Sequence, residues 1–367
     1  MTKAQPTAAA IPAKVDYPFP NDRFGARPVR CAVVGVGRMG RHHARTYANL
    51  AGCKLVGVVD ADKERRESVA ETYGCAALER VDQLVDLGVD AVSIAVPTTY
   101  HYAAAEPLLK AKVACLIEKP LAGDVATAMR IKDLALSTGA GLMVGHIERF
   151  NPAMRAMQKL AAATAPFPVI PRFMQVIRVS PMSFRSVDVG VVMDMMIHDL
   201  DVVIMLMGGR EPVSIRATGV SVVTGHEDLC TAWLEFDTPN GRCVADVTAS
   251  RLALKTERVT RITGEHGYIK IDYGAKKGTV IRRLANEIQM SEVREQLAQG
   301  HDLTSLKWDQ LVNVEDLAVD DAEPILMEIK AFIDSVRTGQ RPPIDAEAGF
   351  ANVRTAERIV EAIRQAK

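Results

Sequence analysis

The chain has 367 residues, enough for two domains of roughly 150 residues each. Lys plus Arg and Asp plus Glu both number 45, so the net charge is zero, which argues against a nucleic-acid-binding surface because neutralising phosphates needs a basic excess. No run approaches the roughly 18 apolar residues that span a bilayer, and the first residues have no signal-peptide core. These features predict a cytoplasmic protein that binds neither nucleic acid nor membrane.

The pattern of cysteines also indicates a cytoplasmic protein. None has C-x-x-C spacing, and most lie in apolar, strand-like runs, which favours buried, reduced thiols over a disulfide framework or a zinc site. They are Cys31, Cys53, Cys75, Cys115, Cys230 and Cys243.

The first half of the chain alternates short apolar runs with helical segments. Residues 1–28 are rich in Ala and Pro, and we expect a loose leader whose last part packs on the body. After them the predicted strands are 29–35, 54–60, 90–97, 113–120 and 141–145, with a weak one near Cys75, and the predicted helices are 38–50, 63–73, 101–111 and 124–138. This alternation predicts a doubly wound, parallel α/β domain over 29–148.

The second half, residues 149–367, has longer strands with more alternating polarity. The predicted strands are 172–179, 213–223, 229–236, 241–250, 257–264 and 268–273, and the predicted helices are 151–163, 190–207, 324–338 and 346–366. The T-P-N-G sequence at 238–241 indicates a hairpin turn. We expect an α/β domain around a large, mostly antiparallel open sheet, an irregular segment at 284–322, and final helices able to pack back on the first domain.

A glycine-rich turn ends the first strand. Gly35-Val36-Gly37-Arg38-Met39-Gly40 is a G-x-G-x-x-G motif, in which the first glycine permits a tight turn, the second lets the backbone approach a pyrophosphate, and the third lets helix and strand pack closely. The next strand ends at Asp60, 20 residues beyond the last glycine, where a carboxylate accepts ribose hydroxyls and repels a 2′-phosphate. The motif predicts NAD binding in preference to NADP. The neighbouring cations Lys63, Arg65 and Arg66 leave NADP open, although a solvated helix face explains them as well.

Four motifs together resemble the Gfo/Idh/MocA family of NAD(P)-dependent oxidoreductases. They are G-V-G-R-M-G, A-V-P-T-T-Y-H (95–101), E-K-P (118–120) and D-M-M-I-H-D (194–199), in order along the chain. The resemblance implies an N-terminal Rossmann domain, a C-terminal α/β domain with a large open sheet, and a homodimer or homotetramer formed through that sheet. V-G-H-I-E-R-F-N-P (144–152) and 183–201 further resemble the branch that contains UDP-N-acetylglucosamine 3-dehydrogenases, which oxidise the C3 hydroxyl of a nucleotide sugar.

Three residues are the candidate catalytic group. Lys119 ends a predicted strand of the parallel sheet, where ligands bind, and partial burial there would make it a usable proton carrier. Asp194 and His198 are four residues apart, so they share one face of a helix whose other residues are apolar. The resemblance assigns Lys119 a hydrogen bond to the reacting oxygen, while His198 suits a general base and Asp194 suits its orientation or a substrate hydroxyl. Whether Lys119 or His198 is the base stays open. Asp199 and Asp201 add acids to this helix, but we expect no metal.

Loop residues complete the cofactor site. Pro97, Thr98 and His101 follow a predicted strand and are expected over the nicotinamide ribose and pyrophosphate, with Thr98 also suited to cap the next helix. The full set of expected cofactor contacts is Gly35, Gly37, Arg38, Met39, Gly40, Asp60, Pro97, Thr98, His101, Glu118 and Lys119.

The substrate is expected between the two domains. Because the chain has no net charge, binding the two phosphates of a UDP-sugar would need arginines positioned in the site. Arg178 and Arg185 are candidates, since they flank the segment that leads to the helix of His198. Arg149 suits either a diphosphate or a pair with Glu148, and Asn151 before Pro152 suits a helix cap. The expected substrate contacts are Lys119, His146, Arg149, Asn151, Arg178, Arg185, Asp194 and His198.

Four functions are consistent with these motifs. The first is an NAD-dependent oxidation of a sugar hydroxyl, at C3 of a UDP-N-acetylhexosamine. The second is a polyol, inositol or free-sugar dehydrogenase, which would need no arginines for phosphate. A non-catalytic NAD-binding regulator and an NAD-dependent glycosidase are further alternatives, the former disfavoured by the intact catalytic group.

Overall fold

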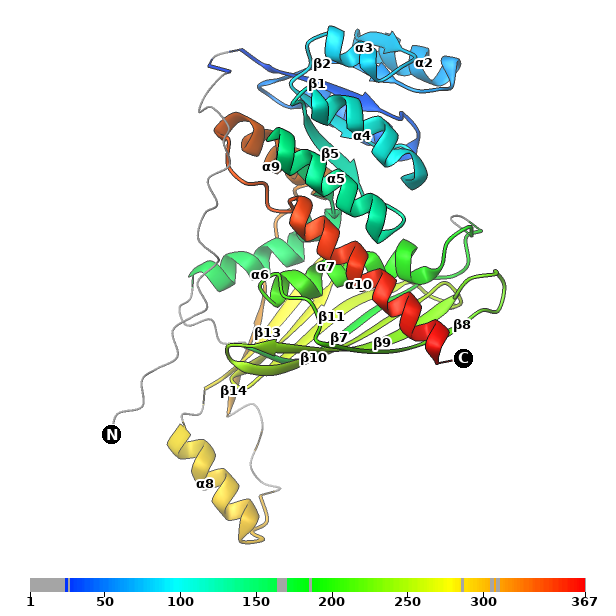
Figure 1. Ribbon diagram of the computed structural model, residues 1–367. Coiled ribbons are helices and arrows are strands. Elements are labelled where there is room, and N and C mark those ends of the chain that lie inside the picture. Colours follow the sequence, from blue (N-terminus) through cyan, green and yellow to red (C-terminus); the bar gives the residue numbers. More distant parts are fainter. Residues whose placement is uncertain are drawn as a thin grey trace.

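The computed structural model describes residues 24–25, 27–163, 170–184, 187–284, 287–303, 307 and 311–366. It consists of two domains, each built on one sheet (Figure 1). Within the described part of the chain, no helix is long and apolar enough to cross a membrane.

The first domain contains a six-stranded parallel sheet in the order β3-β2-β1-β4-β5-β6, which is the Rossmann order. Its strands are β1 (Val29–Val34), β2 (Cys53–Val59), β3 (Ala76–Leu78), β4 (Ala91–Ile94), β5 (Ala114–Glu118) and β6 (Leu142–Gly145). Its helices are α1 (Arg38–Asn49), α2 (Lys63–Tyr73), α3 (Asp82–Asp86), α4 (His101–Lys110) and α5 (Val125–Thr138), with the short 3₁₀ turns η1 (Thr98–Tyr100) and η2 (Ile147–Phe150). All six predicted strands are confirmed, while α3 and the two 3₁₀ turns were not predicted.

The second domain contains an eight-stranded sheet in the order β14-β13-β12-β11-β7-β10-β9-β8. Its strands are β7 (Pro171–Val179), β8 (Ser214–Val220), β9 (Leu229–Thr238), β10 (Gly241–Ser250), β11 (Glu257–Gly264), β12 (Gly267–Asp272), β13 (Lys277–Arg283) and β14 (Val312–Asp316). Only β7 and β10 pair in parallel, so the prediction of a mostly antiparallel sheet is confirmed. The hairpin at 238–241 is also confirmed, with Gly241 at φ +102°.

One face of this second sheet is covered by helices and the other is open. The covering elements are α6 (Pro152–Ala163), the π-helical turn η3 (Val192–Met196), α7 (Ile197–Leu206) and the end of α10 (Ala346–Gln365). Along β9 the side chains alternate, because successive residues of a strand face opposite sides. Leu234 and Phe236 are buried under the helices, whereas Trp233 on the open face is 37% exposed.

The segment 284–322, predicted to be irregular, contains regular structure. It includes α8 (Glu287–Ala298), which projects from the body in Figure 1, and the edge strand β14, which pairs with β13. Both are polar and mostly exposed, so they lack the apolar periodicity that sequence reasoning depends on.

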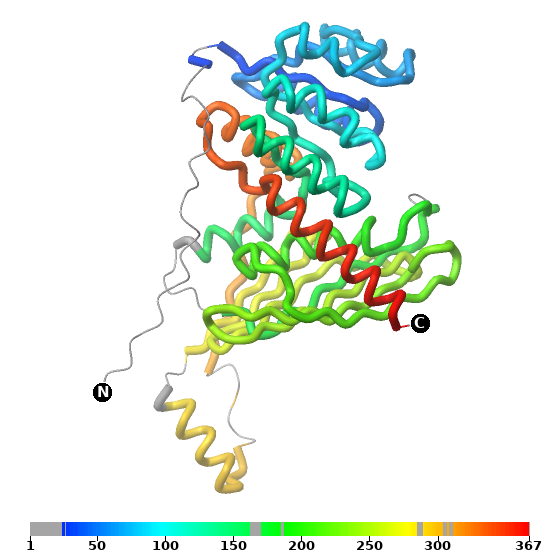
Figure 2. Tube along the Cα trace, viewed as in Figure 1, coloured from blue at the N-terminus to red at the C-terminus, as the bar shows by residue number. Residues whose placement is uncertain are grey.

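The last two helices join the domains. α9 (Pro324–Thr338) packs its apolar face into the core of the first domain through Ile329 and Phe332. α10 contributes Phe350 to that core and, nine residues later, Ile359 to the core of the second domain. Figure 2 shows α10, in red, running from one domain to the other. Near the other end of the chain, the side chain of Phe24 also lies in the first core.

The cysteines agree with the expectation of free thiols. All six lie in described segments and form no disulfide, and Cys31, Cys115, Cys230 and Cys243 are buried.

Candidate active site

The turn between β1 and α1 is shaped for a dinucleotide. Gly35 has φ +83°, and a Cβ there would lie 2.8 Å from the carbonyl oxygen of Ala95. A Cβ on Gly40 would overlap the carbonyl of Gly35, so the third glycine is required by helix–strand packing. Gly37 instead borders open space, and within the described residues no side chain caps α1 there. The N–H groups of its first turn are therefore available to phosphate oxygens.

Asp60 lies directly after β2, beside this turn. Its carboxylate accepts hydrogen bonds from the backbone N–H groups of Val36 (2.8 Å) and Asp62 (3.0 Å). The guanidinium of Arg65 forms an ion pair with it at 3.4 Å, so this cation is engaged by the carboxylate that favours NAD. A cavity of about 550 Å³ adjoins the turn and is lined by Gly37, Arg38, Arg41, His42 and Arg65.

We predict that Asp60→Asn raises the KM for NAD about tenfold, because a neutral amide forms weaker hydrogen bonds to ribose hydroxyls than a carboxylate does. The KM for NADP should change less. Initial rates at varied cofactor concentration measure both. Asp62→Asn is the matched control, since Asp62 caps α2 from an exposed position and Asn caps equally well. An unchanged KM in Asp60→Asn would remove Asp60 from the cofactor site.

The loop after β4 is held by His101. This side chain is 1% exposed, and its ring nitrogens lie 3.1 Å from the carbonyl oxygens of Val96 and Pro120. It therefore joins the two loops that follow β4 and β5. The predicted capping by Thr98 is wrong, because among the described residues no side chain caps η1 or α4. Thr98 begins η1 instead, next to the exposed Pro97.

Lys119 follows β5 and reaches across to the second domain. Its Nζ donates to the backbone carbonyl of Asp194 at 2.8 Å and lies 3.6 Å from Asp194 Oδ1. Burial lowers the pKa of Lys119 from its ordinary value, and the charges of Asp194 and Glu118 only partly oppose this. A lysine in this state exchanges a proton more readily than one in water.

His198 lies one helical turn beyond Asp194, where η3 passes into α7. Its Nδ1 is buried and makes no hydrogen bond to the residues that the structure describes. Burial, together with the charges of Lys119 and Arg178, lowers the pKa of His198 well below its ordinary value. The imidazole is therefore neutral, which is the form that accepts a proton. The structure brings together Lys119, Asp194 and His198, the three residues that the sequence groups as catalytic.

The arginines predicted to bind the substrate's phosphates form ion pairs within the protein instead. Arg178 is 4% exposed, and its guanidinium donates to Asp199 (2.7 and 2.9 Å) and to Glu148 (2.9 Å). Arg149 pairs with Asp201 through two hydrogen bonds of 2.6 Å rather than with Glu148. Both guanidinium groups are neutralised by buried carboxylates, so neither is free for a pyrophosphate.

Two other residues predicted to bind the substrate, Asn151 and His146, form hydrogen bonds with other residues of the protein. Asn151 caps α6, since its Oδ1 accepts from the N–H of Ala153, and its amide donates to Tyr273. His146 is buried against Asn352, and burial lowers its pKa. Arg185 lies outside the described residues.

One arginine that sequence reasoning missed faces the site. Arg258 is directly opposite Arg178 in the β7–β11 pair, so its side chain lies on the helix-covered face of the sheet. It is exposed, and its charge lowers the pKa of His198. Unlike Arg178, it has no carboxylate partner in the described part of the chain. Sequence offered no signal, because only strand register places it there.

We predict that Arg178→Met lowers the free energy of unfolding by about 3–5 kcal/mol, because it leaves Glu148 and Asp199 buried without a counter-ion. Urea titration followed by circular dichroism measures this. Arg216→Met is the control, since Arg216 is an exposed side chain that pairs with Glu235 and lies 5.9 Å from the ring centroid of Trp233, and its loss should change stability by less than about 1 kcal/mol. Unchanged stability with a raised substrate KM would return Arg178 to a substrate-binding role.

The fold and the site define an NAD-dependent oxidoreductase with a Rossmann domain and a separate α/β domain. Family models described as "Oxidoreductase family, NAD-binding Rossmann fold" and "Oxidoreductase family, C-terminal alpha/beta domain" match residues 29–146 and 183–367. The chain belongs to the Gfo/Idh/MocA oxidoreductase family.

Named relatives within the family act on sugars and inositols. A UDP-N-acetylglucosamine 3-dehydrogenase of Acidithiobacillus ferrooxidans is 40% identical over 245 residues, which are 67% of this chain and 74% of the relative. A scyllo-inositol 2-dehydrogenase (NAD(+)) of Bacillus subtilis is 27% identical over 88% of this chain and 92% of its own length. A solved structure of the Acidithiobacillus enzyme superposes with a TM-score of 0.77 at 33% identity, covering 92% of this chain and 97% of that one.

Proposed function

We propose that this protein oxidises the C3 hydroxyl of a UDP-N-acetylhexosamine such as UDP-N-acetylglucosamine to a ketone. The observation that carries the proposal is the 40% identity to a UDP-N-acetylglucosamine 3-dehydrogenase. The chain retains Lys119 and Asp194 in contact at the domain junction, with His198 near enough for the charge of Lys119 to lower its pKa. The inositol dehydrogenases are less similar, which makes inositol oxidation the second candidate.

The chain's residues supply proton transfer and positioning. Bound NAD accepts the hydride that leaves the sugar carbon. His198, neutral and with an unengaged Nδ1, is the base that takes the hydroxyl proton. Lys119 donates a hydrogen bond to the same oxygen, and Asp194 holds the lysine through its backbone carbonyl and carboxylate. The donor is in place before the oxygen gains charge, so no reorganisation is needed in the transition state.

We assign the diphosphate of the substrate to Arg258. It is the exposed guanidinium near His198 that carries no carboxylate partner in the segments that the structure describes, whereas Arg178 and Arg149 are neutralised. A charge-assisted contact from arginine to phosphate is strong and geometrically specific. In a chain of zero net charge, the substrate's negative charge must be met locally in this way.

The test is a substrate panel. We expect NADH absorbance with UDP-N-acetylglucosamine, a product two mass units lighter by mass spectrometry, and little reaction with N-acetylglucosamine or inositols. The mass measurement also detects turnover in which the cofactor stays bound. His198→Asn should lower kcat about 10²- to 10⁴-fold. Preferential oxidation of an inositol would favour the second candidate, and no oxidation of any alcohol would reject both.

We predict that Arg258→Ala raises the KM for the UDP-sugar about 10- to 100-fold, because it removes a charge-assisted contact to phosphate. The rate with any free sugar that reacts should be unchanged. Arg261→Ala is the matched control, since Arg261 is three residues further along β11 and contacts Gln175 on the opposite face. Equal effects on both substrates would reject the phosphate assignment.

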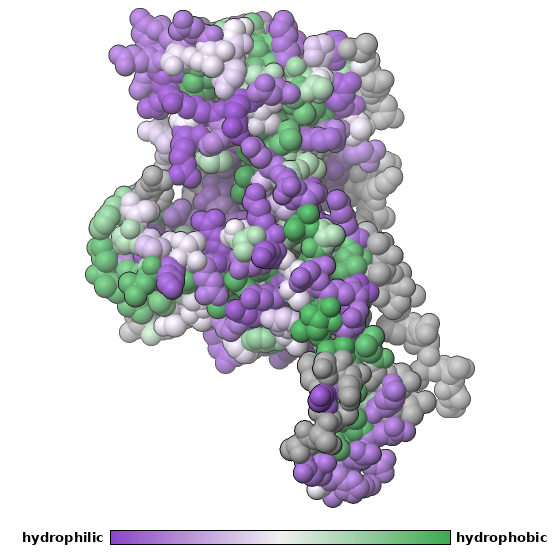
Figure 3. Space-filling view, turned by 180° about the vertical axis from the view of Figure 1, so that it is seen from behind, coloured by the Kyte–Doolittle hydropathy of each residue, from purple (hydrophilic) through white to green (hydrophobic). Residues whose placement is uncertain are grey.

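We also propose a cytoplasmic homodimer or homotetramer that associates through the open face of the second sheet. Trp233 and Phe173 are in ring contact there, with centroids 5.9 Å apart. Figure 3, which shows the molecule from behind, also shows apolar surface at one end of this domain. Exposed apolar side chains of the domain include Phe184, Val187, Val189, Val222 and Val223. Free thiols and a nucleotide cofactor are typical of the cytoplasm.

We predict that Trp233→Arg lowers the oligomeric mass measured by size-exclusion chromatography with light scattering, because it places a charge within the proposed interface. Tyr100→Arg, an equally drastic change at an exposed residue of the first domain, should leave the mass unchanged. A wild-type chain that elutes as a monomer would contradict the proposal.

A further inference from the structure

A buried chain of hydrogen bonds lies behind Lys119. The hydroxyls of Tyr47 and Ser93 are 2.7 Å apart, Ser93 Oγ is 2.9 Å from His43 Nδ1, and His43 Nε2 is 2.9 Å from Glu118 Oε1. Tyr47, Ser93 and His43 are fully buried. One assignment of protons satisfies every group: Tyr47 donates to Ser93, Ser93 donates to Nδ1, and Nε2–H donates to the Glu118 carboxylate.

The chain crosses the cofactor domain from helix to strand. Tyr47 and His43 lie on α1, Ser93 on β4 and Glu118 on β5. The N-terminus of α1 is the phosphate-binding end, and Glu118 is the residue before Lys119. His43 therefore connects the helix that holds the cofactor to the strand end that carries the lysine.

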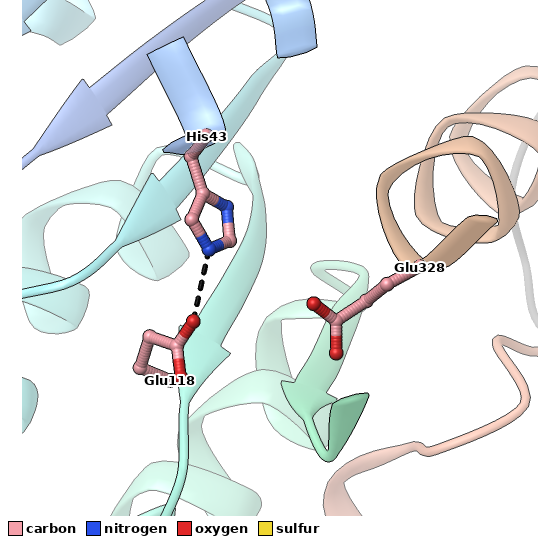
Figure 4. A group of neighbouring side chains, drawn as sticks. All are labelled: His43, Glu118 and Glu328. Atoms are coloured by element: carbon pink, nitrogen blue, oxygen red, sulfur yellow. Dashed lines mark hydrogen bonds and ion pairs between the residues drawn. The ribbon is translucent and has the colours of Figure 1, made fainter. Parts of the chain in front are cut away.

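A second carboxylic acid faces this pair from α9. Figure 4 shows the carboxyl group of Glu328 pointing toward Glu118 and His43, and all three groups offer atoms within 4.8 Å of one another. Glu328 is fully buried, and both its oxygens lack hydrogen-bond partners among the described residues. Burial, with the charges of Glu118 and Asp201, raises the pKa of Glu328 well above its ordinary value. Glu328 is therefore a neutral acid, and the negative charge of the cluster lies on Glu118.

Glu118 is tied closely to Lys119. The backbone N–H of Lys119 donates to Glu118 Oε2 at 3.3 Å. Gly145 on β6 leaves the necessary room, since a Cβ there would lie 3.3 Å from Glu118 Cα and 3.4 Å from Oε2. Burial alone would raise the pKa of Glu118, but the hydrogen bond from His43, with the charge and backbone N–H of Lys119, holds the pKa below its ordinary value. The carboxylate in turn favours the charged form of Lys119.

We propose that His43 and Glu118 are positioning residues of the dehydrogenase reaction: His43 fixes Glu118, and Glu118 sets the charge and the place of Lys119. The proposal rests on the role proposed above for Lys119. Titratable and charged groups of the surrounding elements interact with Glu118 or Lys119: His43 from α1, Glu328 from α9, His146 from the end of β6, Asp194 from η3, His198 from α7 and Arg178 from β7. Asp201 on α7 interacts with Glu328 and His146.

The test is the pH profile of kcat/KM, with three variants. Glu118→Gln keeps the side-chain shape but removes the charge that favours the ammonium form of Lys119. The limb of the profile that reports Lys119 should move about one unit to lower pH, whichever protonation state is active. If the ammonium form is active, kcat/KM on the alkaline side of that limb should fall about tenfold. His43→Leu should move the same limb in the same direction, and His43→Gln, which retains an N–H donor, should restore part of the shift.

Glu328→Gln separates the proposal from a general effect of disturbing the core. Because Glu328 is neutral in this scheme, its amide isostere should leave the pH profile within about 0.3 units, although it changes the same cluster. Glu106→Gln is the second control, since Glu106 is a half-buried residue of α4 that pairs with Lys110, away from this cluster. The dissociation constant for NAD, measured by fluorescence, should stay within about threefold in the His43 and Glu328 variants, so a shift of the limb in these variants reports Lys119 rather than cofactor binding.

Three results would overturn the inference. The first is an unchanged limb in Glu118→Gln in a protein that still binds NAD. The second is an equal shift in Glu328→Gln, which would mean that the charge affecting the titration of Lys119 lies on Glu328 of α9. The third is a stoichiometric divalent metal in the purified protein with activity lost on chelation, which would make the cluster a metal site. Lys119→Met tests the premise separately, because full activity in that variant would reject the role of the lysine rather than that of Glu118.

Discussion

The contact between Lys119 and Asp194 is the constraint on which the rest of the site depends. It joins the end of a strand in one domain to a helical turn in the other, at 2.8 Å from Nζ to a backbone carbonyl. A lysine is costly to bury, and this position removes most of its hydration. The domains must therefore meet in one arrangement, in which a carbonyl and a carboxylate replace the lost water. That arrangement also brings His198 to the same place.

Buried ion pairs hold this arrangement. The segment after β6 supplies Glu148 and Arg149, and α7 supplies Asp199 and Asp201. Arg178 on β7 completes the set by bridging Glu148 and Asp199. Such pairs contribute less to net stability than their distances suggest, because each charge loses its hydration. Misplacing one of them is expensive, however, so they favour a single register between the domains. This explains why Arg149 and Arg178, which the sequence predicts to bind phosphate, instead form ion pairs with carboxylates of the protein.

In the cofactor domain, too, buried polar groups connect elements that are far apart in the sequence. A chain of hydrogen bonds runs through its polar interior from α1 through β4 to β5, with each donor matched to an acceptor. Beside Glu118 lies Glu328, whose carboxyl oxygens have no hydrogen-bond partner among the described residues. A fully satisfied network is rigid, while a single unsatisfied acid in it marks a place where charge is controlled. The catalytic lysine is thus supported by its contact with Asp194 and by the charge of Glu118.

The sequence by itself determined the class of fold, the dinucleotide turn and the candidate catalytic group, because these depend on local patterns. Alternating apolar runs predict a parallel sheet, three glycines are needed at fixed spacing, and Lys119, Asp194 and His198 lie in short motifs. Only the tertiary structure decided which charges are free. Arg178 and Arg149 are neutralised by residues 21 to 52 positions away, and Arg258 faces the site through strand register. Pairing between distant carboxylates and guanidinium groups leaves no local pattern, and the same holds for His43, Glu118 and Glu328, which meet only when α1, β5 and α9 pack together.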